Sequence, residues 1–148
     1  MTRLTYLSCF GTTLFLVLMV SLQSLSFGQS KDADQQKPGI TITSVPNDPP
    51  GEQMAGDPIK GTVSGVDPKD YMVVVYAYGD KWYVQPTAAN PLISIKEDKT
   101  WESETHGGFQ FVALIVKSSY EPLATLGTLP KVGGDVIAIS EKKKPEKK

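Results

Sequence analysis

The stretch VVVYAYGDKWYVQPTAANPLISIKEDKTWESETHGG, residues 73–108, decides the fold class. Its β-branched and aromatic residues gather in short runs, and Gly, Pro, Asn and Asp interrupt these runs every few positions. Such runs are typical of β-strands, and such interruptions are typical of turns. The stretch therefore predicts consecutive strands joined by tight turns rather than helices with a 3.6-residue repeat.

The first half of this stretch predicts a β-hairpin. Gly79-Asp80 suits a two-residue turn, which would pair Tyr78 with Lys81 and Tyr76 with Tyr83. Because side chains alternate between the two faces of a strand, this register divides the hairpin into a core face and an outer face. The core face would carry Val73, Val75, Ala77, Trp82 and Val84, and the outer face Val74, Tyr76, Tyr78, Lys81 and Tyr83.

The second half predicts a second β-hairpin with a longer loop. A two-residue turn at Asp98-Lys99 would set Ile95 opposite Glu102, whereas a three-residue loop, Glu97–Lys99, sets Ile95 opposite Trp101. The hydrophobic pattern favours the three-residue loop. Trp101 should then face the core with Ile93 and Ile95, and Glu102 and Glu104 should face water.

The same alternation of runs and turns continues on both sides of this stretch. Pro46–Pro58 holds four prolines and predicts a loop, and Ser118–Gly134 carries little strand signal apart from Leu123–Leu126. Phe111–Val116 is apolar at every position, as expected of a central strand covered on both faces. The seven or eight short strands predict one all-β antiparallel sandwich over residues 39–140. We expect them at Ile40–Val45, Ile59–Val66, Tyr71–Tyr78, Lys81–Gln85, Leu92–Lys96, Thr100–Thr105, Phe109–Lys117 and Asp135–Ser140.

Several short motifs between Ile59 and Ser140 occur together in a known kind of domain. They are Trp82, Pro91-Leu92, Thr100-Trp101, Thr105–Gly108, Ala113, Tyr120–Pro122 and Thr128–Pro130. In this combination the chain resembles a small immunoglobulin-like β-sandwich module that recurs in secreted bacterial proteins. The turn before the second tryptophan usually carries Gly in such sequences, and Lys99 stands there instead. The resemblance implies an immunoglobulin-like fold and export, and it brings no established activity with it.

The chain begins with the features of a cleavable signal peptide. Arg3 is the only charge in the first 30 residues, and Leu14–Val20 is an unbroken apolar run of seven residues. That length suits a signal peptide and is too short for a membrane span. Ser26–Gly28 places small residues before a cut that would leave Gln29 first. We expect residues 1–28 to be removed and the protein to be periplasmic, on the cell surface or extracellular; an uncleaved signal anchor is the alternative.

The composition limits the kinds of site that the mature protein can form. Cys9, the only cysteine, lies in the expected signal peptide, so disulfides, thiolate zinc sites and cysteine nucleophiles are excluded after cleavage. The net charge of −1 gives no attraction to nucleic acid. We expect a flexible lead-in at 29–38 and a Lys-rich, disordered tail at 141–148, with no membrane attachment once the signal is gone.

The candidate ligand-binding residues are Tyr76, Tyr78, Lys81 and Tyr83. On the predicted outer face of the first hairpin they would form a flat aromatic platform, which can stack on sugar rings or on another protein. The alternative is that this face packs against another part of the domain.

Other polar residues are weaker candidates for a catalytic or metal-binding role. Asp98, Ser103 and His106 are the residue types of a catalytic triad, but they crowd into nine residues of one turn and strand. Glu102 and Glu104 predict a solvated strand face, and Asp67–Asp70 predicts a turn rather than a calcium loop. We therefore expect no catalytic residue, cofactor or metal.

The sequence thus predicts a non-enzymatic, secreted binding module. The first partner class is a glycan or another cell-envelope polymer, bound through the aromatic face. The alternative is a structural or protein–protein interaction module whose aromatic residues all lie in the core.

Overall fold

A computed structural model describes residues 36–46 and 56–145 of the chain. Every regular element in these ranges is a β-strand. The strands are β1 (Gly39–Ser44), β2 (Asp57–Ser64), β3 (Tyr71–Tyr78), β4 (Trp82–Gln85), β5 (Ile93–Ser94), β6 (Thr100–Thr105), β7 (Gln110–Lys117), β8 (Thr125–Leu126) and β9 (Val136–Ile139). The described part of the chain holds no helix with the length and hydropathy that crossing a bilayer requires.

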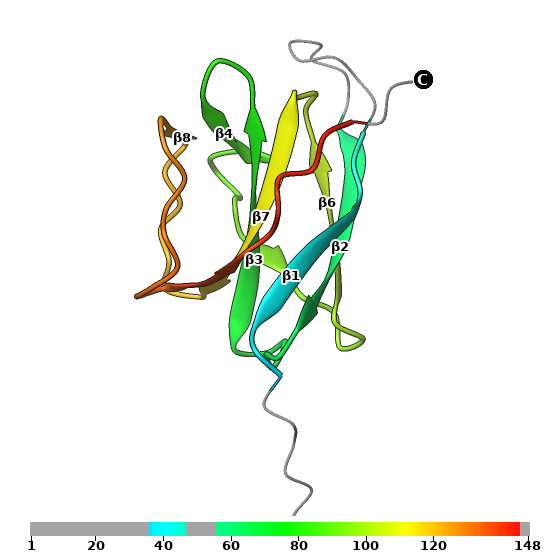
Figure 1. Cartoon of the computed structure of the whole chain (residues 1–148), viewed down its shortest axis with the longest axis vertical. Coiled ribbons are helices and arrows are strands. Elements are labelled where there is room, and N and C mark those ends of the chain that lie inside the picture. Colours follow the sequence, from blue (N-terminus) through cyan, green and yellow to red (C-terminus); the bar gives the residue numbers. More distant parts are fainter. Residues whose placement is uncertain (1–35, 47–55, 146–148) are drawn as a thin grey trace, which may run out of the picture. The chain divides into compact units, whose positions relative to one another are not determined.

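The strands form two antiparallel sheets, which confirms the predicted all-β sandwich. The smaller sheet has the order β1-β2-β6, and the larger has the order β8-β4-β3-β7-β9. Strand β5 pairs with β3 on the edge that β4 also uses, so β4 and β5 occupy successive stretches of one edge. Figure 1 shows β1, β2 and β6 on one side of the sandwich and β3, β4 and β7 on the other.

The inner core lies between the two sheets. Trp101 is 1% exposed, and Ile93 and Ile95 belong to the same buried cluster, as the sequence predicts. Trp101 pairs with Gly61 across β2 and β6, and a Cβ at Gly61 would overlap the indole ring. The bare backbone of this glycine therefore makes room for the largest side chain of the core. The other inner-core residues are Ile40, Ile42, Ile59, Val63, Val66, Val73, Val75, Ala77, Phe111, Ala113, Ile115 and Ala138.

A second hydrophobic cluster, the outer cluster, covers the opposite face of the larger sheet. It holds Val74, Tyr76, Trp82, Val84, Val112, Leu114, Val116 and Val136. The connection between β7 and β9 covers it, because Tyr120, Leu126 and Leu129 pack against it. The two clusters explain why β7 is buried on both faces, as its sequence predicts. The sequence does not predict that the connection between β7 and β9 packs on this sheet, since Ser118–Gly134 has little strand signal.

The predicted register of the first hairpin is wrong by one residue. The structure pairs Tyr78 with Trp82, Tyr76 with Val84 and Ala77 with Tyr83. The loop therefore holds three residues, Gly79–Lys81, rather than two. Because one added residue turns every later side chain to the other face, Trp82 and Val84 lie in the outer cluster and Tyr83 shares the face of Ala77.

The predicted three-residue loop at Glu97–Lys99 is confirmed, but the predicted second hairpin is wrong, because the strands that flank the loop pair with other strands and not with each other. The amide of Lys96 donates to the carbonyl of Thr100 at 2.8 Å, and the amide of Lys99 donates to the carbonyl of Lys96 at 2.9 Å. The loop leads from the larger sheet to the smaller, because β5 pairs with β3 and β6 pairs with β2. Lys99 has a φ of 65°, a left-handed conformation in which a Cβ is strained.

Lys99→Gly is expected to stabilise the domain by up to about 1 kcal/mol, because glycine adopts the left-handed conformation without that strain. Thermal unfolding of the variant and the parent protein measures the gain. Lys99→Ala is the matched control, since it removes the charge and the side chain but keeps the Cβ. If the alanine variant gained as much as the glycine variant, the side chain rather than the backbone would be the cause.

The ordered chain extends past the expected domain boundary at Ser140. Phe111 and Lys143 exchange backbone hydrogen bonds of 2.8 and 2.9 Å, so the pairing along β7 continues beyond β9. The expected disordered tail is therefore wrong for Glu141–Lys143. The expected signal peptide, its cleavage site and most of the lead-in lie outside the described residues.

Candidate functional site

The four predicted ligand-binding residues do not form one surface. Tyr76 is wholly buried in the outer cluster, and its hydroxyl donates to the carbonyl oxygen of Leu123 at 3.2 Å. Burial, with the neighbouring Tyr120 phenol, raises the pKa of Tyr76. The predicted platform fails here because the β7–β9 connection packs over this face of the sheet.

Tyr78 is half-buried and packs against Trp82. The two ring centroids are 5.0 Å apart and the ring planes are inclined by 52°. The ammonium group of Lys142 lies 5.6 Å from the centroid of the Trp82 ring. Trp82 is only 5% exposed, and the pair belongs to the outer cluster, where both residues line a pocket of about 420 Å³.

Tyr83 and Lys81 do lie together at the surface. Tyr83 is 38% exposed, and the ammonium of Lys81 lies 5.4 Å from the centroid of its ring. The phenol donates to Oδ1 of Asp80 at 2.7 Å. This hydrogen bond lowers the pKa of Asp80 and raises the pKa of Tyr83, so the carboxylate and the neutral phenol are the forms present at neutral pH.

Phe109 adds a second exposed ring at the same end of the domain. Its amide donates to the carbonyl of Tyr78 at 2.9 Å, which sets it beside the Gly79–Lys81 loop. Phe109 lies in the bend immediately before β7, next to Gln110, which pairs with Tyr78 at the end of the β3–β7 ladder. Phe109 is 58% exposed.

We call Tyr83, Phe109, Asp80 and Lys81 the aromatic rim. Four large hydrophobic side chains in the described ranges are exposed, and the two aromatic ones belong to this rim; the other two are Leu123 and Val132. Sequence analysis identified Tyr83 and Lys81 and missed Phe109, which it treated only as the start of a strand. The clue was the position of Phe109 two residues before Phe111, opposite the hairpin loop.

The residue types of a triad do not assemble. Asp98 accepts hydrogen bonds from the amide and hydroxyl of Thr100, at 2.9 and 2.6 Å. Ser103 donates to the carbonyl of Glu104, and the amide of His106 donates to the side-chain oxygen of Gln85. In the part of the chain that the structure describes, no hydrogen bond joins Asp98, Ser103 and His106 to one another.

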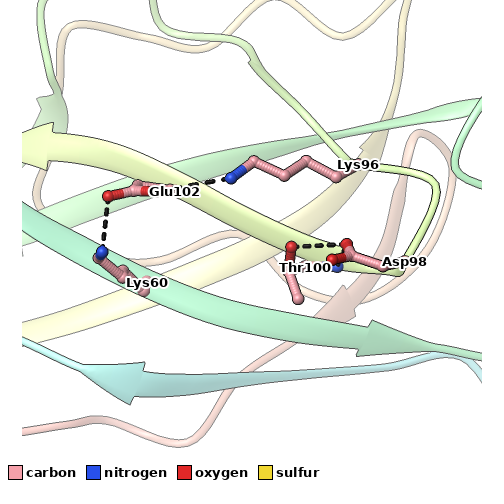
Figure 2. A network of polar contacts seen from close by, with 5 residues as sticks. All are labelled: Lys60, Lys96, Asp98, Thr100 and Glu102. Atoms are coloured by element: carbon pink, nitrogen blue, oxygen red, sulfur yellow. Dashed lines mark hydrogen bonds and ion pairs between the residues drawn. The ribbon is translucent and has the colours of Figure 1, made fainter.

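The carboxylates of the smaller sheet form a solvated ionic network, shown in Figure 2. Glu102 lies 2.8 Å from the ammonium of Lys60 and 3.5 Å from that of Lys96. The hydrogen bond from Lys60 and its charge lower the pKa of Glu102. These two lysines neutralise Glu102, and the described ranges hold no group of three or more His, Cys, Asp or Glu residues placed to hold a metal.

The predicted turn at Asp67–Asp70 matches the observed hydrogen bonds. The amide of Lys69 donates to Oδ1 of Asp67 at 3.0 Å, and the amide of Asp70 donates to the carbonyl of Asp67 at 3.2 Å. The carboxylate of Asp67 therefore closes its own turn.

The aromatic rim combines groups that suit binding. Exposed rings offer an apolar stacking surface, and the Asp80 carboxylate and Lys81 ammonium offer one acceptor and one donor beside it. No family model, curated protein or solved structure matches this chain, so the proposed function rests on the geometry of the site.

Proposed function

We propose that the chain is a non-enzymatic binding module of an exported protein, and that its aromatic rim contacts a glycan or another cell-envelope polymer. The single observation behind this proposal is the exposure of two aromatic rings, Tyr83 and Phe109, on segments that meet at one loop end of the sandwich. Export rests on the signal-like N-terminus, which lies outside the described residues.

Stacking is the physical basis of the proposed binding. A sugar ring presents an apolar face of C–H groups, and it gains free energy by covering a solvated aromatic ring. The hydrogen bond from Tyr83 to Asp80 fixes one ring before any ligand arrives, so less side-chain entropy is lost on binding. Asp80 and Lys81 can then accept from and donate to sugar hydroxyls at the edge of the stack.

The strand order supports an immunoglobulin-type sandwich. One sheet has the order β1-β2-β6, and the other contains the order β4-β3-β7-β9 with β8 added beside β4. In sandwiches of this type the loops cluster at the two ends. The loop Gly79–Lys81 and the segment before Phe111 meet at one of these ends.

A protein–protein interaction module is the second candidate. Burial of Tyr76 and Trp82 favours it, because these rings serve the outer cluster and leave a smaller aromatic surface than the predicted platform. An exposed Tyr–Phe pair also suits a protein partner. Both candidate functions use the same exposed residues, so the chemical class of the ligand, glycan or protein, distinguishes them.

The double variant Tyr83→Ala/Phe109→Ala is expected to lose at least tenfold in affinity for an insoluble cell-wall polysaccharide. Each aromatic stacking contact contributes about 0.5–1.5 kcal/mol beyond its buried area, and about 1.4 kcal/mol corresponds to a factor of ten. Pull-down isotherms with purified cell-wall glycan measure the affinity. The loss should persist in high salt, since stacking depends little on ionic strength.

Leu123→Ala/Val132→Ala is the matched control, because these two side chains are also large, apolar and exposed but lie outside the rim. The control variant should retain both binding and melting temperature. Glycan binding that survives in the rim variant would contradict the assignment of the site. Absence of glycan binding by the unmodified protein would favour the protein–protein candidate.

A further inference from the structure

A groove of about 660 Å³ separates the edge strands of the two sheets. Strand β1 forms one wall, and β9 with the chain that follows it forms the other. Both strands end their sheets: β1 pairs only with β2, and β9 pairs only with β7 within its sheet. No residue of the aromatic rim lines this groove.

The backbone of β1 offers hydrogen-bonding groups to the groove. The amide of Val63 donates to the carbonyl of Lys99, so it points toward β6 and away from β1. Val63 lies opposite Ile40, which makes this a pair without ladder hydrogen bonds. The N–H and C=O of Ile40 therefore point to the free edge, and by alternation those of Ile42 do as well.

The same argument places backbone groups on the opposite wall. The amide of Ser140 donates to the carbonyl of Ala113, toward β7. Alternation turns the N–H and C=O of Ile139 the other way, into the groove. No backbone hydrogen bond joins β1 to β9 within the described ranges, so the two edges face each other unpaired.

The charge of the groove is positive. Its charged lining residues are Lys37, Lys142, Lys143 and Glu141, which give a net charge of +2. Lys37 precedes β1, whereas Lys142 and Lys143 follow β9. In Figure 1 the chain from β9 to the end of the described residues climbs in the same direction as β1, so the cations stand at opposite ends of the groove.

We propose that this groove binds an extended peptide segment of a partner protein that carries acidic side chains at both ends and adds a strand to β1. Main-chain hydrogen bonds would come from the edge groups of Ile40 and Ile42, and the lysines would attract the flanking carboxylates. Strand β1 takes the peptide because it has six residues and β9 has four. This site is separate from the aromatic rim and adds a protein partner to the proposed glycan.

The test uses the exported protein and an end-capped peptide, Asp-Val-Thr-Val-Thr-Val-Asp, with a fluorescent label. Anisotropy titration at low salt should show saturable binding. A Lys-flanked analogue should bind at least tenfold more weakly, and this difference should shrink at high salt. N-methylation of the alternate peptide residues that face β1 should also weaken binding at least tenfold, whereas methylation of the other set should not. Hydrogen exchange should slow at the amides of Ile40 and Ile42.

Charge reversal supplies a second test. Lys37→Glu/Lys143→Glu should bind the Lys-flanked peptide better than the Asp-flanked one. Lys69→Glu/Lys99→Glu is the charge-matched control, because both lysines are exposed and lie outside the groove, and it should keep the original preference. Failure of the Asp-flanked peptide to bind, equal binding of both N-methylated forms, or protection at Ile139 in place of Ile40 would overturn the proposal. None of these outcomes bears on glycan binding at the rim.

Discussion

Trp101→Ala should lower the free energy of unfolding by about 3–5 kcal/mol, the range found when a large aromatic side chain is removed from a packed core. Trp101 is 1% exposed and lies between the sheets with Ile93 and Ile95. The backbone cannot close the cavity easily, because β2 and β6 hold Gly61 and Trp101 in a fixed register. The sequence holds a single cysteine, so no intrachain disulfide supports the domain, and a loss of this size is a large fraction of its stability. Chemical denaturation followed by circular dichroism measures it.

Two variants sharpen this prediction. Tyr83→Ala removes a 38% exposed aromatic ring and should change stability by much less than Trp101→Ala. Trp101→Phe should also lose less, because it keeps most of the apolar volume. It also removes a buried indole N–H that has no hydrogen-bond partner among the described residues. An alanine variant within about 1 kcal/mol of the parent would show that Trp101 does not anchor the core.

The burial of Trp101 was predictable because one register alone joins two apolar side chains. At the second turn, the choice lay between pairing Ile95 with Glu102 and pairing it with Trp101. Only one face of β6 is buried, as its alternating burial shows, so the hydrophobic pattern carries the information that fixes the register. The loop length followed from that pattern.

The register predicted for the first hairpin is wrong for the opposite reason. The larger sheet is covered on both faces, so its strands are apolar at almost every position, and β3 is buried from Val73 to Ala77 without a break. A shift of one residue there exchanges one apolar neighbour for another. The hydrophobic pattern then cannot choose between a two-residue and a three-residue loop, and the Gly79-Asp80 turn motif alone misled the prediction.

The candidate site was only partly predictable because exposure depends on distant segments. Tyr76 is buried by a connection that includes its hydrogen-bond partner Leu123, 47 residues further along the chain. Phe109, two residues before the fully buried Phe111, stays 58% exposed. Neither fact follows from local alternation, which assigns a side chain to a face and does not say what covers that face.

Tyr76→Ala should destabilise the domain by about 3–5 kcal/mol, as expected for removing a fully buried aromatic side chain. It should also weaken the attachment of the β7–β9 connection, because the Tyr76 ring fills the outer cluster beneath it and its hydroxyl bonds Leu123. The amide of Val84 donates to the carbonyl of Ala124 at 3.0 Å, so its hydrogen exchange reports whether this connection stays in place. Denaturation and exchange of the Val84 amide together measure both effects.

Tyr76→Phe separates the ring from the hydroxyl. The phenylalanine ring still fills the cluster, and the loss is limited to the contacts of the hydroxyl with the Leu123 carbonyl and the Tyr120 phenol, which contribute about 1 kcal/mol each. If Tyr76→Phe cost as much as Tyr76→Ala, the hydroxyl rather than ring packing would hold the connection. If neither variant changed stability, Tyr76 would be an exposed surface residue and the aromatic platform predicted from the sequence would have to be restored.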